Sequence, residues 1–314
     1  MNAVRSVPDA TGGSGEDGFT VVVPQYGDSA GARALVGALR AQVGAPVLQI
    51  VVVDDASPEP FALGDDDGVT VLRRERNGGF GAAVNTGAAV AEHPLLLVLN
   101  SDLDIDPSFV ADLVRASAPW QPAVCAPLVV GFDGATQWAG RRWPRTRHHV
   151  VEWLTPLARW RPRLHEAVGH DTRCTAGVVL PVDWVMGAAL LIPTAAFHAI
   201  GGFDEAYFMN VEEVDLQRRL TAAGVPSVFL GTVRVRHEGG GSSDADRRLR
   251  WLVQARLRYA EKWGERPGLL RAGLRAASVV NLVWNAGRRV AGRDTTPLAA
   301  FRRELAAIRP GGGV

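Results

Sequence analysis

The chain has 314 residues, of which 47% are hydrophobic, so it is long enough to bury one large core or two modest ones. Its 34 basic residues nearly cancel its 33 acidic residues, and the net charge of +1 excludes the strong positive field typical of nucleic-acid-binding proteins, so we predict no nucleic-acid partner. Cys125 and Cys174 are far apart and have the spacing of neither a zinc site nor a disulfide framework, which predicts a cytoplasmic protein with reduced thiols.

The amino-terminal part of the chain divides into a polar leader and a periodic region. Residues 1–17 are polar and glycine-rich without the apolar segment of a signal peptide, and they predict a disordered leader. From Phe19 onward, apolar runs alternate with helix-like segments. Strands are predicted over residues 19–24, 47–55, 69–74 and 94–100, with helices over residues 31–42 and 81–91. Strands that lack polar alternation and are separated by helices indicate an α/β fold with a parallel sheet covered on both faces.

Polar side chains follow three of these predicted strands at the point where each strand ends. In open α/β sheets, ligands bind beyond the carboxyl ends of the strands. The residues in question are Pro24, Gln25 and Tyr26 after the first strand, Asp54 and Asp55 after the second, and Asn100, Asp102 and Asp104 after the fourth. This pattern predicts a ligand site at that edge of the sheet.

The aspartates after the fourth strand occupy alternate positions, at Asp102, Asp104 and Asp106. On an extended chain, side chains two residues apart point to the same side, so these carboxylates repel each other unless a cation lies among them. A bound divalent metal is one such cation, and a solvated turn is the alternative. Asp106 precedes Pro107 and a helical pattern, so it is predicted to cap that helix.

The second half of the chain is less regular. Residues 131–181 crowd arginine, histidine and tryptophan with little periodicity and predict an irregular insertion. Sheet-like character returns over residues 183–193, a helix is predicted over residues 211–224, and a late strand ends at His237. Residues 244–314 are predicted to form a basic helical region.

Five segments carry a family resemblance. They are "VVVDDAS", "NGGFGAAVNTG", "LVLNSD", "GGFDEAYFMNVEEVDLQRRL" and "VRHEGGGS". In this order they resemble the landmarks of the family 2 inverting glycosyltransferases with the GT-A fold, a nucleotide-binding, mostly parallel mixed sheet with helices on both faces. Within that family, the chain is similar to the rhamnosyltransferase-like branch that acts on lipid-linked cell-wall or surface-polysaccharide precursors. The resemblance implies a catalytic domain over residues 18–243, in which residues 131–181 lie on the acceptor side.

The resemblance implies transfer of a sugar, rhamnose in this branch, from a dTDP- or UDP-linked donor to a hydroxyl of a glycan or polyprenyl-diphosphate-linked acceptor. The matching donor-binding residues are Pro24, Tyr26, Asp54, Asp55, Asn77, Gly79, Phe80, Asn85, Asn100, Ser101 and Asp102. Glycines at a helix start allow close backbone approach, and the helix N-terminus favours a diphosphate. A dinucleotide fingerprint is the competing interpretation, and it fails because Val84 stands where glycine or alanine is needed.

The resemblance also implies a cofactor, Mg²⁺ or Mn²⁺. Asp102 matches the metal-binding end of the family's acidic motif, which has Asn100 in its first position here, and Asp104 is a second candidate. His237 matches a late histidine that completes the metal or diphosphate site in some relatives. Hard oxygen ligands suit both ions, and substrate phosphates supply further ligands, so one or two carboxylates suffice.

The predicted general base is Glu213, which matches the aspartate that takes the acceptor proton in the family. Glu212 and Asp215 are the fallback candidates. A capping box between Asn210 and Glu213 is the structural alternative, because asparagine followed three residues later by glutamate is typical of helix starts. The change from aspartate to glutamate leaves open a second function, a catalytically impaired relative that only binds the nucleotide sugar.

Two basic regions raise alternatives of their own. We predict that Arg141, Arg142, Trp184 and Gly187 bind the acceptor, because guanidinium groups in this arginine-rich segment would bind a lipid diphosphate. A solvated charged face is the alternative. From Lys262 onward, ten basic residues face three acids among apolar ones. This composition predicts either a helix on an anionic membrane surface, at the inner face of the cell membrane, or amphipathic helices packed on the catalytic domain or in a homodimer.

Overall fold

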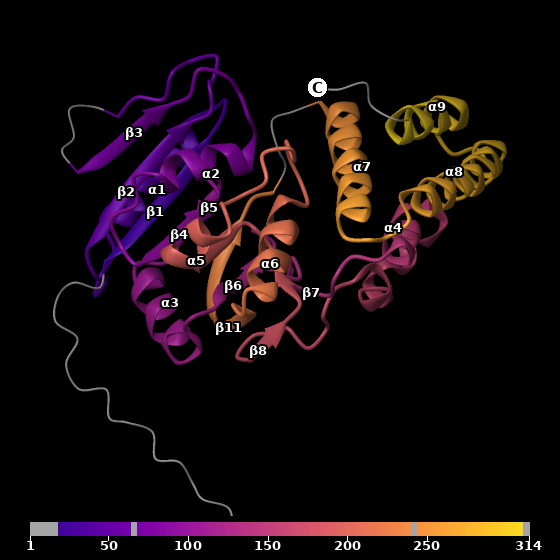
Figure 1. Ribbon diagram of the computed structural model, residues 1–314. Helices are drawn as coiled ribbons and strands as arrows, with labels where there is room; N and C mark the ends of the chain where they lie inside the picture. Colours follow the sequence, from indigo (N-terminus) through magenta and orange to yellow (C-terminus); the bar gives the residue numbers. More distant parts are fainter. Residues whose placement is uncertain (1–17, 64–67, 240–243, 310–314) are drawn as a thin grey trace, which may run out of the picture.

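The computed structural model describes residues 18–63, 68–239 and 244–309, and the predicted leader of residues 1–17 lies outside them. The chain first builds a sheet with helices packed on it, the sheet unit, which ends at His237. Helices α7 (Ala245–Lys262), α8 (Pro267–Val290) and α9 (Pro297–Ile308) then form a helical unit beside it (Figure 1). None of the described helices is both long and apolar enough to cross a lipid bilayer.

The first half of the sheet unit has the predicted alternation of strands and helices. Its elements are β1 (Phe19–Gln25), α1 (Ala30–Arg40), β2 (Leu48–Asp54), β3 (Val69–Arg73), α2 (Phe80–Ala88) and β4 (Leu95–Leu99). The four strands are parallel, in the spatial order β3-β2-β1-β4. Small side chains let α2 approach the sheet closely, since a Cβ added to Gly87 would lie 2.6 Å from a methyl group of Val22.

The second half of the sheet unit contains a reversal of strand direction. Its elements are β5 (Leu103–Asp104), α3 (Phe109–Ser117), η1 (Ala118–Trp120), β6 (Val124–Val130), β8 (Val179–Val182), β9 (Trp184–Val185), β10 (Ala189–Pro193), α5 (Thr194–Ala199), α6 (Glu212–Ala222) and β11 (Ser227–His237). The sheet continues from β4 in the order β10-β6-β11-β5, with β8 also paired to β11. Because β10 is antiparallel to both β4 and β6, the sheet is mixed and not wholly parallel as its apolar strands alone suggest.

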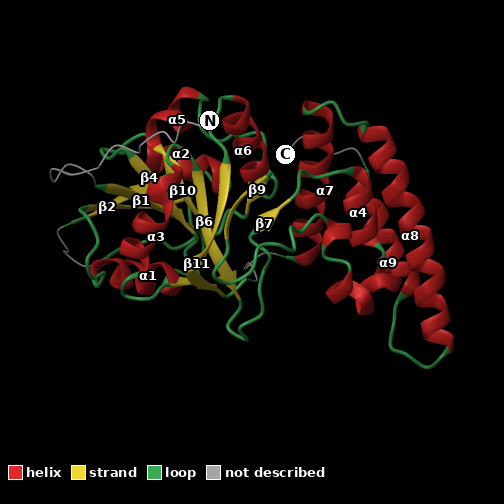
Figure 2. Ribbon diagram, turned by 90° about the horizontal axis from the view of Figure 1, so that it is seen from below, coloured by secondary structure: helices red, strands yellow, loops and turns green. Residues whose placement is uncertain are grey.

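Residues 131–181 are more ordered than predicted. They contain β7 (Gly140–Arg141), which pairs with β9, and α4 (Thr146–Trp153), followed by the short 3₁₀ segments η2 (Thr155–Arg163) and η3 (Glu166–Val168). Helix α4 packs against α8 (Figure 2). The Trp153 indole donates to Ser278 Oγ at 2.9 Å, and Asn281 donates to the Trp153 carbonyl at 2.9 Å. Helix α4 therefore packs as part of the helical unit, although the predicted boundary at residue 243 assigns it to the catalytic domain.

Each unit has its own apolar core. The core of the sheet unit is built from the apolar strands and the inner faces of α1, α2 and α3. The helical unit has a smaller core of buried side chains from α7, α8 and α9, namely Val253, Leu257, Ala260, Leu270, Leu274, Ala307 and Ile308. The basic carboxyl-terminal region therefore folds by packing its amphipathic helices on one another.

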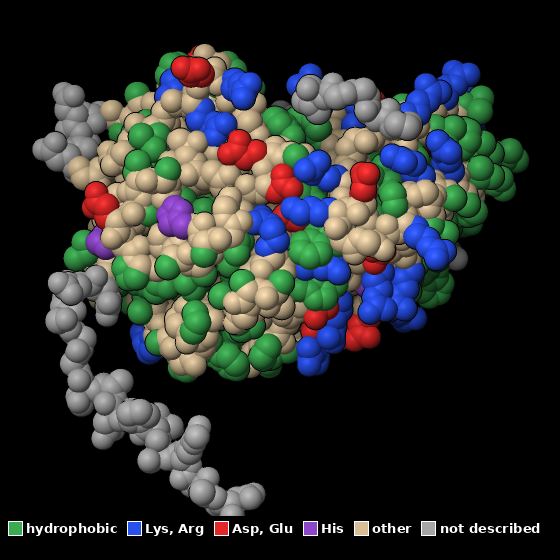
Figure 3. Space-filling model, in the orientation of Figure 1, with side chains coloured by type: hydrophobic (Ala, Val, Ile, Leu, Met, Phe, Trp, Pro, Cys, Tyr) green, Lys and Arg blue, Asp and Glu red, His purple; other side chains and the backbone are tan. Residues whose placement is uncertain are grey.

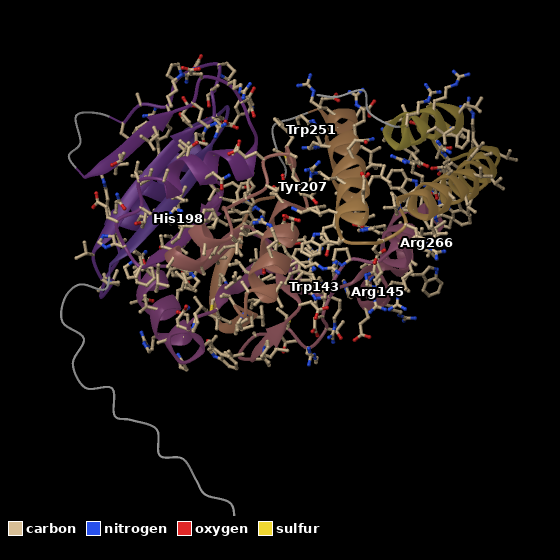
Figure 4. All side chains as sticks on the ribbon, viewed as in Figure 1. Trp143, Arg145, His198, Tyr207, Trp251 and Arg266 are labelled. Atoms are coloured by element: carbon tan, nitrogen blue, oxygen red, sulfur yellow. The ribbon has the colours of Figure 1, made fainter. Side chains whose placement is uncertain are left out.

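Aromatic and basic side chains join the two units. The labelled Trp143, Tyr207 and Trp251 lie where the sheet unit meets α7 (Figure 4). The guanidinium of Arg218, on α6, lies 5.6 Å from the ring centre of Trp143 and 4.6 Å from that of Trp263. Such contacts bury ring surface and keep the cation paired, so they hold α7 at a defined distance from α6.

Candidate active site

Two cavities meet at the start of α6, beside the carboxyl ends of β4 and β11. The first, which we call the sheet cavity, has a volume of about 230 Å³ and is lined by Phe80, Asn100, Met186, Gly187, Ala188, Met209, Asn210, Glu212, Glu213 and His237. The second, the junction cavity, has a volume of about 290 Å³ and is lined by residues of β7, α4, α6 and α7. Asn210 and Glu213 line both cavities. A side chain shared in this way can contact two ligands at once.

The backbone before α6 adopts a conformation that side chains rarely allow. Asn210 and Val211 have φ values of 72° and 70°, in the left-handed region that is particularly unfavourable for a β-branched residue such as valine. Val211 occupies the cap position, so the helix begins one residue later than a capping box at Asn210 requires. This strained turn directly precedes Glu212, which lines the sheet cavity, and Glu213, which lines both cavities.

Glu213 has the environment of a general base. Burial raises the pKa of its carboxyl group, while first-turn N–H groups and the positive charge of Arg141 partly oppose that shift. A carboxylate with a raised pKa accepts a proton more readily at neutral pH, as base catalysis requires. Gly187 keeps the space beside it open, because an added Cβ there would lie 3.3 Å from the Glu213 Cβ.

Glu212 is more deeply buried than Glu213. Its Oε2 atom has no hydrogen-bond partner among the described residues. Burial raises the pKa of Glu212 well above its ordinary value, and the neighbouring charge of Glu213 raises it further. The positive charge of Arg141 opposes the shift at Glu213. Both carboxyl groups therefore hold a proton more tightly than a free glutamate does, and Glu213 has the nearby cation that favours its ionised form.

Asp215, the other fallback base, does not lie at the site, and we withdraw it. It is fully buried, on the opposite side of α6 from the cavities. Its carboxylate accepts hydrogen bonds from Arg219 Nε, Lys262 Nζ and Trp263 Nε1, each at 2.9 Å. These bonds tie α6 to the end of α7. Asp215 is an anchor between the two units.

Asp102 lies next to the sheet cavity, in contact with His237, which lines it. His237 Nε2 lies 3.3 Å from Asp102 Oδ1 and 3.4 Å from the Asn100 side-chain amide. The other ring nitrogen, Nδ1, contacts Gln137 Oε1 at 2.7 Å, which orients the imidazole. Burial acts to raise the pKa of Asp102, but the hydrogen bond and charge of His237 outweigh it, so the pKa lies below its ordinary value.

Asp104 is not part of this group, and its predicted metal role is corrected. Its carboxylate is paired with Arg236 Nη1 at 2.5 Å, and the other terminal nitrogen of Arg236 lies 3.9 Å from Asp106. The alternating aspartates do converge on a cation, but for Asp104 and Asp106 that cation is an arginine of β11. Within the described residues, no group of three or more histidine, cysteine, aspartate or glutamate side chains is arranged to hold a metal ion.

Two of the predicted donor-binding carboxylates are occupied by the protein itself. Asp54 is fully buried, accepts from the Ser57 and Phe61 amides at 2.8 Å and 3.0 Å, and is paired with Arg73. Burial acts to raise its pKa, but these hydrogen bonds outweigh it and the pKa is lowered. Asp54 therefore holds the following loop in place, and direct contact with a donor is excluded while these bonds persist.

Asp55 fills the helix start at which a diphosphate was expected. Its carboxylate accepts from the Gly78 and Gly79 amides, the second at 2.8 Å, and pairs with Arg74. Asn77 also turns inward, accepting from the Gly79 amide at 3.1 Å. The N–H groups before α2 are thus satisfied internally, and the predicted phosphate contact through Gly79 is corrected.

The other predicted donor residues divide between the cavity and the scaffold. Phe80 and Asn100 line the sheet cavity. Pro24 and Tyr26 lie at the end of β1, where Tyr26 is 49% exposed, and Ser101 is partly exposed. Asn85 does not face the cavity, and its donor role is corrected: its amide exchanges hydrogen bonds with the backbone of Phe203, at 2.8 Å and 3.0 Å.

The predicted acceptor residues occupy both cavities. Arg141, Arg142 and Trp184 line the junction cavity, and Gly187 lines the sheet cavity. The Arg141 guanidinium donates to the Trp138 carbonyl at 3.0 Å and lies 5.4 Å from the Trp184 ring centre, so its position is well defined. Arg142 is 3.3 Å from Asp171.

The far wall of the junction cavity was not predicted from the sequence. This wall is made by His148, His149, Glu152, Leu252 and Arg256. The histidines belong to a basic run that was visible in the sequence, but Arg256 comes from α7, which lies about a hundred residues further along the chain. Burial lowers the pKa of both histidines, and nearby arginines lower it further. Only the packing of α7 beside α4 brings these groups together.

Comparison with known proteins agrees with this architecture. The sequence profile described as Glycosyl transferase family 2 matches residues 20–176. The N-acetylglucosaminyl-diphospho-decaprenol L-rhamnosyltransferase of Mycobacterium tuberculosis is 31% identical over 222 residues, covering 66% of this chain and 71% of the relative. The O-antigen biosynthesis protein RfbC of Myxococcus xanthus is 31% identical over 229 residues, covering 68% of this chain and 17% of the relative.

Two solved structures share the fold. GalNAc-T7 with UDP, GalNAc and Mn²⁺ superposes with a TM-score of 0.52 at 19% identity, covering 74% of this chain and 48% of that one. The mannosyltransferase PcManGT from Pyrobaculum calidifontis, in complex with GDP-Man and Mn²⁺, superposes with a TM-score of 0.50 at 15% identity, covering 92% and 85%. The predicted GT-A fold and family are confirmed: this chain is a rhamnosyltransferase-like member of glycosyl transferase family 2.

Proposed function

We propose that the protein is an inverting glycosyltransferase that moves a sugar, rhamnose in our assignment, from a dTDP- or UDP-linked donor to a hydroxyl of a lipid-linked glycan precursor. The observation that carries this proposal is the position of Glu213, which lines both the sheet cavity and the junction cavity. Inversion needs a base on the acceptor side of the sugar, opposite the leaving diphosphate. A carboxylate between two cavities meets that requirement.

The proposed reaction is a single displacement. The Glu213 carboxylate takes the proton of the acceptor hydroxyl, whose oxygen forms a bond to the anomeric carbon while the bond from that carbon to the diphosphate oxygen breaks. The donor would occupy the sheet cavity and the acceptor the junction cavity. Positioning the two reactants against one carboxylate contributes to rate by holding them in line.

Mg²⁺ or Mn²⁺ fits the residues at the end of the sheet cavity. Two ligands at right angles on an ion with bonds of about 2.1 Å lie about 3.0 Å apart. Asp102 Oδ1 and His237 Nε2 are 3.3 Å apart. In the tautomer in which His237 Nδ1 donates to Gln137 Oε1, Nε2 would carry the lone pair that a metal ligand needs. These two side chains would hold the ion, with substrate phosphates and water completing its shell. When bound, the ion would neutralise charge on the departing diphosphate.

The junction cavity suits an anionic acceptor. Three of its lining residues, Arg141, Arg142 and Arg256, carry guanidinium groups, which bind phosphate oxygens in pairs. We assign this cavity to the diphosphate of a polyprenyl-linked acceptor, as the name of the mycobacterial rhamnosyltransferase suggests for that relative. With a lipid-linked acceptor, we propose that the protein acts in the cytoplasm, at the inner face of the cell membrane.

The experiment compares the wild-type chain with Glu213→Gln. Nucleotide sugars are screened by thermal shift with Mn²⁺ present, and transfer or donor hydrolysis is then measured with and without Mg²⁺ or Mn²⁺. The variant should bind the donor normally but lose about 10²- to 10⁴-fold in turnover, the usual contribution of a general base. Glu261→Gln, at an exposed site on α7, is the matched control.

Two results would contradict the proposal. Donor binding without turnover by the wild-type chain would support the alternative of a binding-only relative. Unchanged turnover in Glu213→Gln would remove Glu213 as the base.

A further inference from the structure

The outer face of α8 is a continuous apolar surface. The inner face of this helix buries Leu270, Leu274, Ala277, Ser278 and Asn281. The large hydrophobic side chains on the outer face are Leu269, Val279, Val280, Val283, Trp284 and Val290. Val283 is 67% exposed and Val290 is 91% exposed. Figure 3 shows hydrophobic side chains along the edge of the molecule that α8 occupies in Figure 1, with basic side chains beside them.

Helical geometry makes these residues one stripe. Residues 269, 276, 280, 283, 287 and 290 follow each other at intervals of three, four or seven, so they lie on one side of an α-helix. All six of these positions are exposed and are occupied by leucine, alanine, valine or glycine. A helix of 24 residues is about 36 Å long at 1.5 Å per residue. The stripe is therefore a continuous apolar surface along the helix, unlike the single exposed hydrophobic side chains that are common on soluble proteins.

The charged residues of α8 itself have a single sign. The helix contains four arginines, Arg271, Arg275, Arg288 and Arg289, and no aspartate or glutamate, whereas the whole chain has a net charge of +1. Glu265 and Asp294 lie in the chain just before and just after the helix. Arg275 and Arg288 are exposed on α8. A helix that carries an apolar stripe and only cationic charges is complementary to an anionic surface that also has an apolar interior.

We infer that the outer face of α8 docks on a lipid bilayer that contains anionic lipids. The helix lies along the membrane surface, with its valines and Leu269 in the acyl boundary, its arginines at the headgroups, and Trp284 at the interface between them. A second copy of the chain is the other occupant of such a face. Pairing two copies through α8 would bring arginine-flanked surfaces of like charge together, which disfavours it. This inference extends the proposed function, because it supplies the surface on which a lipid-linked acceptor is met.

The test is vesicle co-sedimentation of the full chain without any sugar donor. Vesicles of phosphatidylcholine with 30% phosphatidylglycerol are compared with vesicles of pure phosphatidylcholine. The variant is Val280→Glu with Val283→Glu, both at exposed positions. The matched control is Val43→Glu with Val47→Glu, which carries the same two changes at sites 68% and 66% exposed in the loop before β2. Circular dichroism and thermal unfolding establish that both variants fold.

The wild-type chain and the control should bind the anionic vesicles, with binding that falls as salt rises, and should bind the neutral vesicles at least tenfold more weakly. The α8 variant should lose at least tenfold in binding to the anionic vesicles. Absence of binding by the wild-type chain, or equal binding by the two variants, would overturn the inference. A lipid-free dimer that only the α8 variant dissociates would also overturn it, by assigning the face to a second copy. Because no donor is present, each of these results leaves the transfer proposal to its own test.

Discussion

Replacing Asp215 by asparagine tests whether this carboxylate holds the two units together or takes part in the chemistry. Asp215 is fully buried and accepts three hydrogen bonds, from Arg219, Lys262 and Trp263. Removing one partner of a buried ion pair costs about 3–5 kcal/mol. Both cations keep a second acceptor, since Arg219 donates to the Ile200 carbonyl at 3.0 Å and Lys262 to Asp204 at 2.8 Å. We therefore expect the lower end, a loss of about 3 kcal/mol in the free energy of unfolding.

The assay is urea unfolding at pH 7 followed by tryptophan fluorescence, to which Trp263 and the eight other tryptophans contribute. A loss of this size lowers the melting temperature by about 6 °C or more in a domain of this size class. Asp112→Asn is the control, because Asp112 pairs with Arg115 on an exposed helix surface, where such pairs contribute at most about 1 kcal/mol. Turnover of Asp215→Asn, measured well below its melting temperature, should remain within a few-fold of wild type. Unchanged stability combined with lost turnover would refute the reasoning and return Asp215 to the reaction.

Three further substitutions test the site. Arg141→Met removes a positive charge that lowers the pKa of Glu213, the proposed base, so the acid limb of the kcat/KM profile should move to higher pH. An unmoved limb would show that Arg141 does not act on the proposed base. Gly79→Ala should destabilise by about 3 kcal/mol or more in thermal unfolding, because its φ is 86° and the new Cβ would lie 1.8 Å from the Phe208 carbonyl oxygen. Asp102→Asn should weaken Mn²⁺ binding in the presence of UDP about tenfold, measured by water-proton relaxation, whereas Asp104→Asn should leave it unchanged; equal effects would contradict our assignment of Asp102.

The pKa directions of the buried acids also have a consequence for stability. A carboxyl group whose pKa is raised by folding binds its proton more tightly in the folded state, so the stability it contributes is lost as pH rises from its unfolded pKa through its folded pKa. Glu212 is such a group. Burial of the Glu212 carboxyl group therefore lowers the stability of the fold above its unfolded pKa. Such a cost is expected at a candidate site, where side chains are selected for function as well as for stability.

The sequence determined the types and order of the elements in the first half of the chain. Short apolar β-branched runs bounded by turn residues favour strands, and small residues at positions such as Gly87 let a helix lie close to a sheet, because both effects depend on neighbouring residues. The position of the candidate site was predicted from the same pattern, since the carboxyl ends of adjacent parallel strands share an edge. Family membership was also available from five ordered segments.

The tertiary structure decided which of the candidate acidic residues face a cavity and which are paired with other side chains of the protein. Glu213 and Asp215 are two residues apart, and a helix turns by about 200° over that distance, so one faces the cavities and the other faces α7. Nothing local distinguishes them, because the difference arises from Lys262 and Trp263 on another helix. Asp104 likewise meets Arg236, which is 132 residues away.

Local sequence also leaves open the direction of the strands and the composition of the junction cavity. An apolar run such as residues 189–193 specifies a buried strand but not its direction, since the side chains of a strand with two buried faces look alike in either orientation. The junction cavity needs α4 and α7 side by side, and no short-range signal connects segments about a hundred residues apart. Local periodicity therefore determined what each segment is, and long-range packing decided which charges pair, which stay free, and where the two cavities meet.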